Sequence, residues 1–150
     1  MKNNQKGITL VALVITIIVL LILAGVTIAA LSGQNGILTN ASNSQVQNAL
    51  GNAKDQINLA ANEGIQAYYN MKYLNENDTI AGPATGTTKA GEVVKKYVEK
   101  RAVTGNPLEG VTVEVTGENA PYSITITTTD KTATTATGTI TEDGAVNWTN

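Results

Sequence analysis

The chain has 150 residues, with 10 basic and 12 acidic side chains, a net charge of −2, and no cysteine, histidine or phenylalanine. Without cysteine it forms no disulfide and no thiolate metal cluster. The weak charge and the lack of a long basic run exclude the pattern of a nucleic-acid surface. The carboxylates are scattered and match no catalytic motif, so we expect a protein that is not an enzyme and has no cofactor or metal.

An apolar run without a charged side chain begins at Ile8 and continues to Leu31. At about 1.5 Å per residue, a helix of about 24 residues is long enough to cross the roughly 30 Å hydrocarbon core of a membrane. The polar residues before it include Lys2 and Lys6 but no acid. This flank predicts that the N-terminus stays in the cytoplasm and that the rest of the chain lies outside.

A removable export signal is the alternative interpretation of the same run. Such a signal has an apolar centre of roughly 7–15 residues that ends at small residues. Ala24-Gly25 and Ala29-Ala30 are small enough for such a site, but the apolar run is longer than an export signal requires. The length therefore favours a membrane helix that stays with the protein.

The junction between the basic flank and the apolar run carries a motif. Lys6-Gly7 is followed by Ile8-Thr9-Leu10, so a short basic leader ends in glycine before an apolar residue and a threonine-leucine pair. Over residues 2 to about 31 the chain resembles the type IV pilin precursors. The resemblance implies cleavage after Gly7 by a prepilin peptidase, often with N-methylation of Ile8. It also implies an assembly ATPase and a polytopic platform protein as partners.

One position departs from the family pattern. Pilins usually carry a glutamate five residues into the mature chain, and the matching residue here is Ala12. In the family this carboxylate is thought to neutralise the N-terminus of a neighbouring subunit inside an apolar core. Its absence is consistent with another route of subunit entry, with a filament held mainly by apolar packing, or with a pilin-like protein outside the usual bacterial machine, such as the archaeal pilins.

Small and hydroxylated residues recur within the apolar run. Ala12 with Thr16, and Gly25 with Ala29, form pairs that allow close approach between helices. Threonine hydroxyls in such a helix bond to the preceding turn, which makes them tolerable in lipid. The residues predicted to pack in a filament core are Ile8, Ala12, Thr16, Val19, Leu23, Gly25 and Ala29.

Residues 32–38 interrupt the pattern, with Gly33, Gly36 and an Asn-Gly pair that predict a helix break. Thr39 is a plausible N-cap for a second, amphipathic helix over residues 39–74. Its apolar face has spacings of three and four: Val46, Leu50, Ala53, Ile57, Ala60, Gly64, Tyr68 and Met71. This face either packs on the protein's own sheet or contributes to self-association. From Ile8 through Ala53 no side chain is ionisable, which suits a segment surrounded by its own copies because repeated like charges repel.

Residues 75–150 are predicted to form a globular head. Residues 75–91 are predicted to form a solvated loop, and weak calcium binding at 75–78 is the alternative. A short helix follows over residues 92–102. Its basic residues are predicted to form a solvated face or a contact for acidic neighbours: Lys89, Lys95, Lys96, Lys100 and Arg101.

The last forty residues alternate β-branched and polar positions, as in Val111–Thr116 and Tyr122–Thr127. Turns are predicted at 117–121, 129–131 and at Asp143-Gly144. The pattern indicates an antiparallel meander of about four strands with threonine outside and an inner face on the amphipathic helix. Trp148 is expected to anchor the core at the end of this layer, and binding of a surface ligand by Trp148 or the tyrosines is the alternative.

The expected fold is α+β, divided into a leader (1–7), an apolar helix (8–31), a break (32–38), an amphipathic helix (39–74) and a head (75–150). The resemblance implies a structural subunit of an extracellular type IV pilus-like filament that polymerises through its apolar helix. A pseudopilin of a secretion or DNA-uptake apparatus, and an anchored surface domain that never polymerises, are the alternatives. We expect a membrane-anchored precursor, a mature protein in cell-surface filaments, and no nucleic-acid contact.

Overall fold

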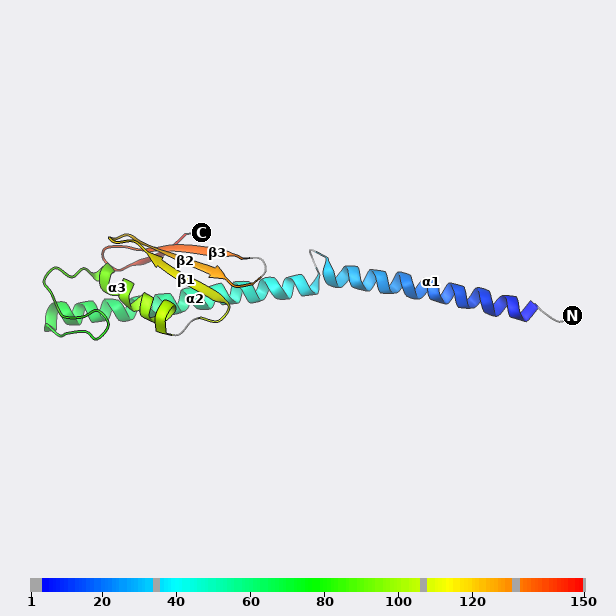
Figure 1. Ribbon diagram of the computed structural model, residues 1–150, viewed down its shortest axis with the longest axis horizontal. Coiled ribbons are helices and arrows are strands. Elements are labelled where there is room, and N and C mark those ends of the chain that lie inside the picture. The colour runs from blue at the N-terminus through cyan, green and yellow to red at the C-terminus, as the bar shows by residue number, and fades with distance from the viewer. Residues whose placement is uncertain (1–3, 34–35, 106–107, 131–132, 150) are drawn as a thin grey trace. The chain divides into compact units, whose positions relative to one another are not determined.

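The computed structural model describes residues 4–33, 36–105, 108–130 and 133–149. The chain divides into two compact units, Met1–Ser44 and Gln45–Asn150. The helices labelled in Figure 1 are α1 (Asn4–Ser32), α2 (Ile37–Tyr69) and α3 (Ala90–Val98). Two π-helical turns, η1 (Asn70–Leu74) and η2 (Glu99–Gly105), continue α2 and α3.

Helix α1 is almost entirely apolar after its first turns, and each described side chain from Thr9 to Ser32 is exposed. Its two central threonines bond within the helix, as the sequence predicts. The Thr16 hydroxyl donates to the carbonyl of Leu13 at 2.8 Å, and the Thr27 hydroxyl donates to that of Ala24 at 2.9 Å. These bonds satisfy the hydroxyls without a partner outside the helix, which lowers the cost of an apolar environment.

The helix is interrupted between Ser32 and Ile37, where the sequence places Gly33 and Gly36. The Gly36 N–H donates to the Gly33 carbonyl at 2.7 Å, and a Cβ on Gly36 would lie 2.5 Å from the carbonyl oxygen of Leu31. Only glycine fits so close to the backbone. The predicted N-cap role of Thr39 is wrong, since Thr39 lies inside α2 and its hydroxyl donates to the Gly33 carbonyl at 3.0 Å. The helix starts two residues earlier because the carbonyl of Gly36 already accepts the N–H of Asn40.

The second unit is built around the C-terminal half of α2. Its buried side follows the spacing seen in the sequence, and Ile57 and Ala60 are completely buried. Gly64 is buried as well. It lies so close to α3 that a Cβ there would be 2.8 Å from the Cα of Val94. The residues of α2 that are buried are Leu50, Ala53, Ile57, Ala60, Ala61, Gly64 and Ala67. Small residues on α2 therefore allow α3 to approach closely.

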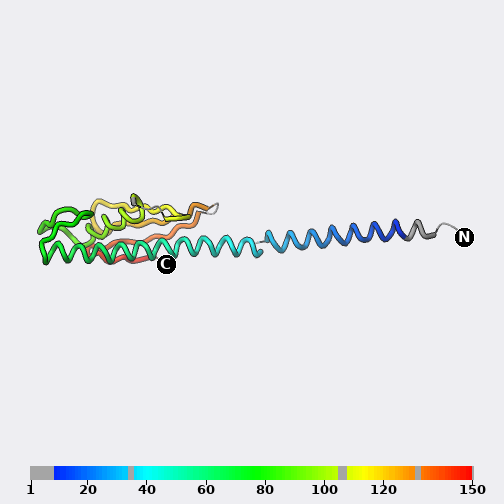
Figure 2. The backbone as a smooth tube through the Cα atoms, turned by 90° about the horizontal axis from the view of Figure 1, so that it is seen from below, coloured from blue at the N-terminus to red at the C-terminus, as the bar shows by residue number. Residues whose placement is uncertain are grey.

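Four strands form an antiparallel meander in the order β1-β2-β3-β4. They are β1 (Val111–Thr116), β2 (Tyr122–Thr128), β3 (Thr135–Ile140) and β4 (Val146–Trp148). Figures 1 and 2 both show strands running alongside α2, and Ile124, Ile126 and Ile140 pack in one core with its apolar face. The predicted α+β class, with a long apolar helix, a second helix and a C-terminal antiparallel sheet, is confirmed.

The connections between strands follow the predicted turn residues where these are described. Gly117 and Gly144 have φ values of 119° and 90°, a region that favours glycine. The Gly144 N–H donates to the Thr141 carbonyl at 3.0 Å, which closes the turn before β4. The predicted turn at 129–131 lies partly outside the described residues.

Trp148 ends the sheet and packs at the border of the core. Its indole N–H donates to the side-chain oxygen of Asn58 on α2 at 3.1 Å, and the Lys54 ammonium lies 5.3 Å from its ring centroid. A Cβ on Gly138 would lie 2.8 Å from the indole, so the missing side chain in β3 makes room for the ring. The tryptophan ties the last strand to α2.

Candidate processing site and assembly helix

The predicted processing residues Lys6, Gly7 and Ile8 lie in the first turns of α1. The apolar surface that follows them is large. Leu10, Leu20 and Leu21 are 64%, 64% and 68% exposed, and apolar side chains point outward around the whole circumference of the helix. Burying one such side chain contributes roughly 1.5–3 kcal/mol. A helix of this kind therefore requires lipid or other apolar helices around it.

Among the described residues, one helical stretch, which starts at Thr9, is long and apolar enough to cross a membrane. None of its most apolar part is buried. A core helix of a soluble protein would be covered by its own chain, so this exposure favours a membrane or a multi-chain environment.

The residues predicted to pack in a filament core fall on two faces of α1. Ala12, Thr16, Val19 and Leu23 follow helical spacing along one face. Gly25 begins a second face, roughly 220° away at 3.6 residues per turn, and Ala29 continues it. A Cβ added to Gly25 would meet nothing within 4 Å, so nothing in the described chain requires a glycine there. Small residues on two faces would allow close contact with neighbours on both sides of the helix.

The charge-free character of the sequence extends from α1 into α2. Asn40, Ser42 and Asn43 are exposed and uncharged, and Lys54 is the first ionisable side chain after the leader. Ser44 directs its hydroxyl to the Asn40 carbonyl at 2.9 Å. Ala12 leaves the apolar helix without the carboxylate that pilins usually carry.

The basic residues of α3 and its flanks are mostly paired with carboxylates among the described residues. Four of the five pair with carboxylates: Lys89 with Glu142 at 2.6 Å, Lys95 with Glu99 at 3.8 Å, Lys96 with Glu92 at 3.2 Å, and Arg101 with Glu63 at 2.7 Å. These partners neutralise most of the patch. Both side chains of the Lys89–Glu142 pair are exposed, whereas those of Lys95 and Arg101 are partly covered. A solvated face and a contact for acidic neighbours both stay predictions.

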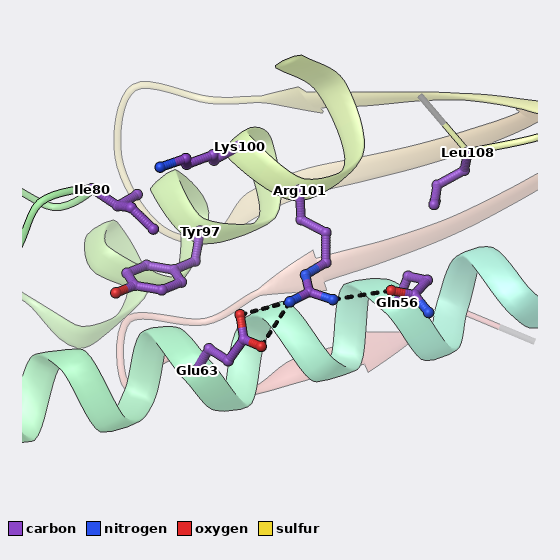
Figure 3. Close-up of a pocket in the computed structure, with 7 residues that line it drawn as sticks. All are labelled: Gln56, Glu63, Ile80, Tyr97, Lys100, Arg101 and Leu108. Atoms are coloured by element: carbon purple, nitrogen blue, oxygen red, sulfur yellow. Dashed lines mark hydrogen bonds and ion pairs between the residues drawn. The ribbon is translucent and has the colours of Figure 1, made fainter. Parts of the chain in front are cut away.

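A pocket of about 360 Å³ lies between α2 and η2, and Figure 3 shows the residues that line it. Arg101 binds both carboxylate oxygens of Glu63, at 2.7 and 2.9 Å, and donates to the Gln56 side-chain oxygen at 3.1 Å. Ile80 and Leu108 supply apolar walls. These three hydrogen bonds of the guanidinium link η2 to α2, so we assign it a structural role.

In the loop at 75–78, the carboxylate of Asp78 accepts hydrogen bonds from other groups of the same chain. One Asp78 oxygen accepts the N–H groups of Ile80 at 2.8 Å and Ala81 at 2.6 Å, and the other accepts the Tyr97 hydroxyl at 2.8 Å. The pKa of Asp78 is lowered from its ordinary value. Partial burial acts to raise it, but the hydrogen bonds from Ala81, Tyr97 and Ile80 stabilise the carboxylate by more than burial destabilises it. Asp78 thus stabilises the folded head above its ordinary pKa of 3.8, and this contribution is lost as the pH falls through the lowered value. In the described part of the chain, no group of three or more acidic residues could hold a metal ion.

Tyr97 provides a test of this loop. Burial, followed by the hydrogen bond to Asp78, raises the pKa of Tyr97 from 10.0 to about 12. The folded state therefore favours the neutral phenol, and the resulting stability is present below pH 10.0 and lost as the pH rises through about 12. We expect the parent chain to show a tyrosine ionisation at about pH 12 in an alkaline titration followed by tyrosinate absorbance, and Tyr97→Phe to lack it. A variant that kept this phase would contradict the assignment.

Comparison with known families identifies the N-terminal segment. Residues 2–28 match the family described as the prokaryotic N-terminal methylation motif, which is the processing signal of type IV prepilins. No curated protein and no solved structure matches the chain. The motif confirms the resemblance drawn from Lys6-Gly7-Ile8 and indicates a type IV pilin-like or pseudopilin protein. It points to a structural role, processing by a prepilin peptidase and assembly into a polymer. With the apolar helix, it fits a membrane-anchored precursor that later enters surface filaments.

Proposed function

We propose, from this processing motif and the uncovered helix α1, that the chain is a structural subunit of an extracellular type IV pilus-like filament. A prepilin peptidase cleaves after Gly7, and the mature subunit begins at Ile8. Residues 8–31 form the filament core, and residues 75–150 form the folded head on the outside. The protein has no enzymatic role in this proposal.

The observation that carries the proposal is the exposed apolar surface of α1. Each apolar side chain that leaves lipid loses roughly 25 cal/mol for each Å² returned to water. A subunit therefore leaves the membrane only if the same surface is buried again. Copies of the same helix offer such a surface, since α1 is apolar on every side and has small residues on two faces.

The missing carboxylate sets how the subunits contact one another. With Ala12 in place of glutamate, residues 8–53 hold no side chain that could pair with the amino group of Ile8. We propose that subunits join through apolar packing and through the uncharged first part of α2. Amides and hydroxyls there contact copies of themselves without like-charge repulsion.

Before assembly, the precursor lies in the membrane with its basic leader in the cytoplasm. Lys2 and Lys6 precede the apolar run, and no acid lies beside them. This asymmetry keeps the leader inside and the head outside, which places Gly7 on the side where the peptidase acts. An assembly ATPase and a polytopic platform protein complete the set of proposed partners.

The first experiment is to determine the N-terminus of the protein recovered from cells. We expect the mature chain to begin at Ile8 and to appear as filaments in sheared supernatants. A strain without the prepilin peptidase is the control, and there the chain should begin at Met1 and remain in membranes. If the chain begins at Met1 in cells with a working peptidase, the proposal is wrong.

The shear fraction also separates the filament subunit from its alternatives. A processed chain that begins at Ile8 but stays with the cell envelope would instead indicate a pseudopilin or an anchored surface domain. Filaments that contain this chain along their whole length would identify it as a major subunit.

A further inference from the structure

The C-terminal turns of α2 and the turn η1 carry an aromatic surface, formed by the partly buried Tyr68 and the exposed Tyr69 and Tyr73. The rings of Tyr69 and Tyr73 stack with centroids 5.9 Å apart and an interplanar angle of 15°. Both are largely uncovered, at 51% and 70% exposure. Aromatic rings are normally buried in a core or an interface, so a stacked, exposed set indicates a contact made outside the folded chain.

This tyrosine surface forms one wall of a groove of about 650 Å³. The turn 141–143 and the residues just before α3 form another part of its lining. That volume lies within the range of roughly 300–1,000 Å³ found for small-molecule sites. The polar residues of this part of the lining include Thr88, Thr141 and Asp143, and the Thr141 hydroxyl donates to the Asp143 carboxylate.

The charges in the groove cancel. Lys89 pairs with Glu142 at 2.6 Å, and the remaining lining charges, Lys72 and Asp143, are of opposite sign. A strongly charged ligand therefore gains no net attraction there. The chemistry that does fit is a neutral ligand with an apolar ring face for the tyrosines and hydroxyl groups for the polar wall. A pyranose sugar has both features.

Lys72 holds the aromatic wall in place before any ligand arrives. Its ammonium lies 5.5 Å from the centroid of the Tyr68 ring and 5.4 Å from that of Tyr73. Cation–π contacts of this kind restrain rings that are otherwise free to rotate. Less side-chain entropy is then lost when a ligand stacks on the rings.

We propose that this groove is a binding site for a neutral oligosaccharide, with a pyranose ring stacked on Tyr69 and Tyr73 and its hydroxyls bonded to the wall at 141–143. The groove lies wholly within the unit Gln45–Asn150, so the unassembled chain already contains all of its lining residues.

The test uses the full chain in detergent micelles, before assembly, with neutral tetrasaccharides of glucose, mannose and N-acetylglucosamine as probes. Saturation-transfer NMR and titration should detect millimolar or tighter binding of at least one of them. The double variant Tyr69→Ala/Tyr73→Ala should bind that sugar about tenfold more weakly or worse, since it loses both stacking faces. Tyr73→Phe keeps the ring and should stay within about threefold of the parent.

Leu59→Ala is the matched control, because Leu59 is an exposed residue of the same helix that does not line the groove. Its sugar affinity should equal that of the parent chain. Tyr69→Trp enlarges the stacking face and should bind at least as tightly as the parent, which keeps the test decisive if the double variant misfolds. Absence of binding to all three neutral sugars, or unchanged binding in the double variant, would overturn the proposal. So would a preference for a sulfated oligosaccharide that disappears at high salt.

Discussion

Leu23→Lys is expected to abolish filaments while the chain is still made and cleaved after Gly7. Leu23 lies in α1 and is 56% exposed, so its side chain is available to lipid or to a neighbouring subunit. A lysine at the centre of a membrane helix costs about 2.5–3.5 kcal/mol, and it lowers this cost by extending its ammonium toward the membrane surface. In a filament core the same charge recurs on each copy and has no carboxylate within residues 8–53 to pair with.

The readout separates assembly from insertion. Membrane extraction and N-terminal sequencing report whether the variant is inserted and begins at Ile8, and the sheared supernatant reports filaments. Leu23→Met keeps the volume and the apolar character, so it should assemble as the parent does. Normal filaments from Leu23→Lys would show that α1 does not form an apolar core.

Ile57→Ala is expected to destabilise the head by about 2–5 kcal/mol, which is a large part of the roughly 5–15 kcal/mol that stabilises a typical domain. Ile57 is fully buried on α2 and packs in the same core as Ile124, Ile126 and Ile140 of the sheet. Truncation removes apolar contacts and leaves a cavity, because helix and sheet are both fixed by their own hydrogen bonds and cannot close the gap.

Denaturant unfolding of the full chain in micelles measures this effect, with the fluorescence of Trp148 as the probe. Trp148 is the single tryptophan of the sequence and reports on the contact between β4 and α2. Leu59→Ala, on the exposed side of the same helix, should change stability by no more than about 0.5 kcal/mol. Both variants gain the helix propensity of alanine, so the difference between them isolates the buried contact. Equal effects would contradict the core as described.

The periodic parts of the fold could be predicted from the sequence alone. A period near 3.6 places Leu50, Ile57 and Ala60 on one side of α2, and alternation places Ile124 and Ile126 on one side of β2. Both groups are buried in the structure. These patterns are readable because an amphipathic helix or a half-buried strand repeats the same environment at each period.

Contacts between distant segments could not be predicted in this way. The pairs Asp78–Tyr97 and Arg101–Glu63 are 19 and 38 residues apart in the chain, and no local pattern relates their members. The sequence indicates five basic residues near α3, and helical spacing of four already pairs Lys95 with Glu99 and Lys96 with Glu92. Only the fold supplies Glu142 for Lys89 and Glu63 for Arg101. The spacing of Tyr69 and Tyr73 indicates that they share a helix face, yet not that this face stays exposed beside a groove.

The sequence by itself determined the N-terminal processing motif and the uncharged apolar helix, since a motif and an unbroken apolar run depend only on neighbouring residues. It also determined the α+β class, because hydrophobic periodicity is a local property. Only the tertiary structure decided that Gly64 and Gly138 make room for Val94 and Trp148, and that the last turns of α2 face an open groove. These features depend on how segments pack in three dimensions, and packing brings together residues whose spacing in the chain carries no signal.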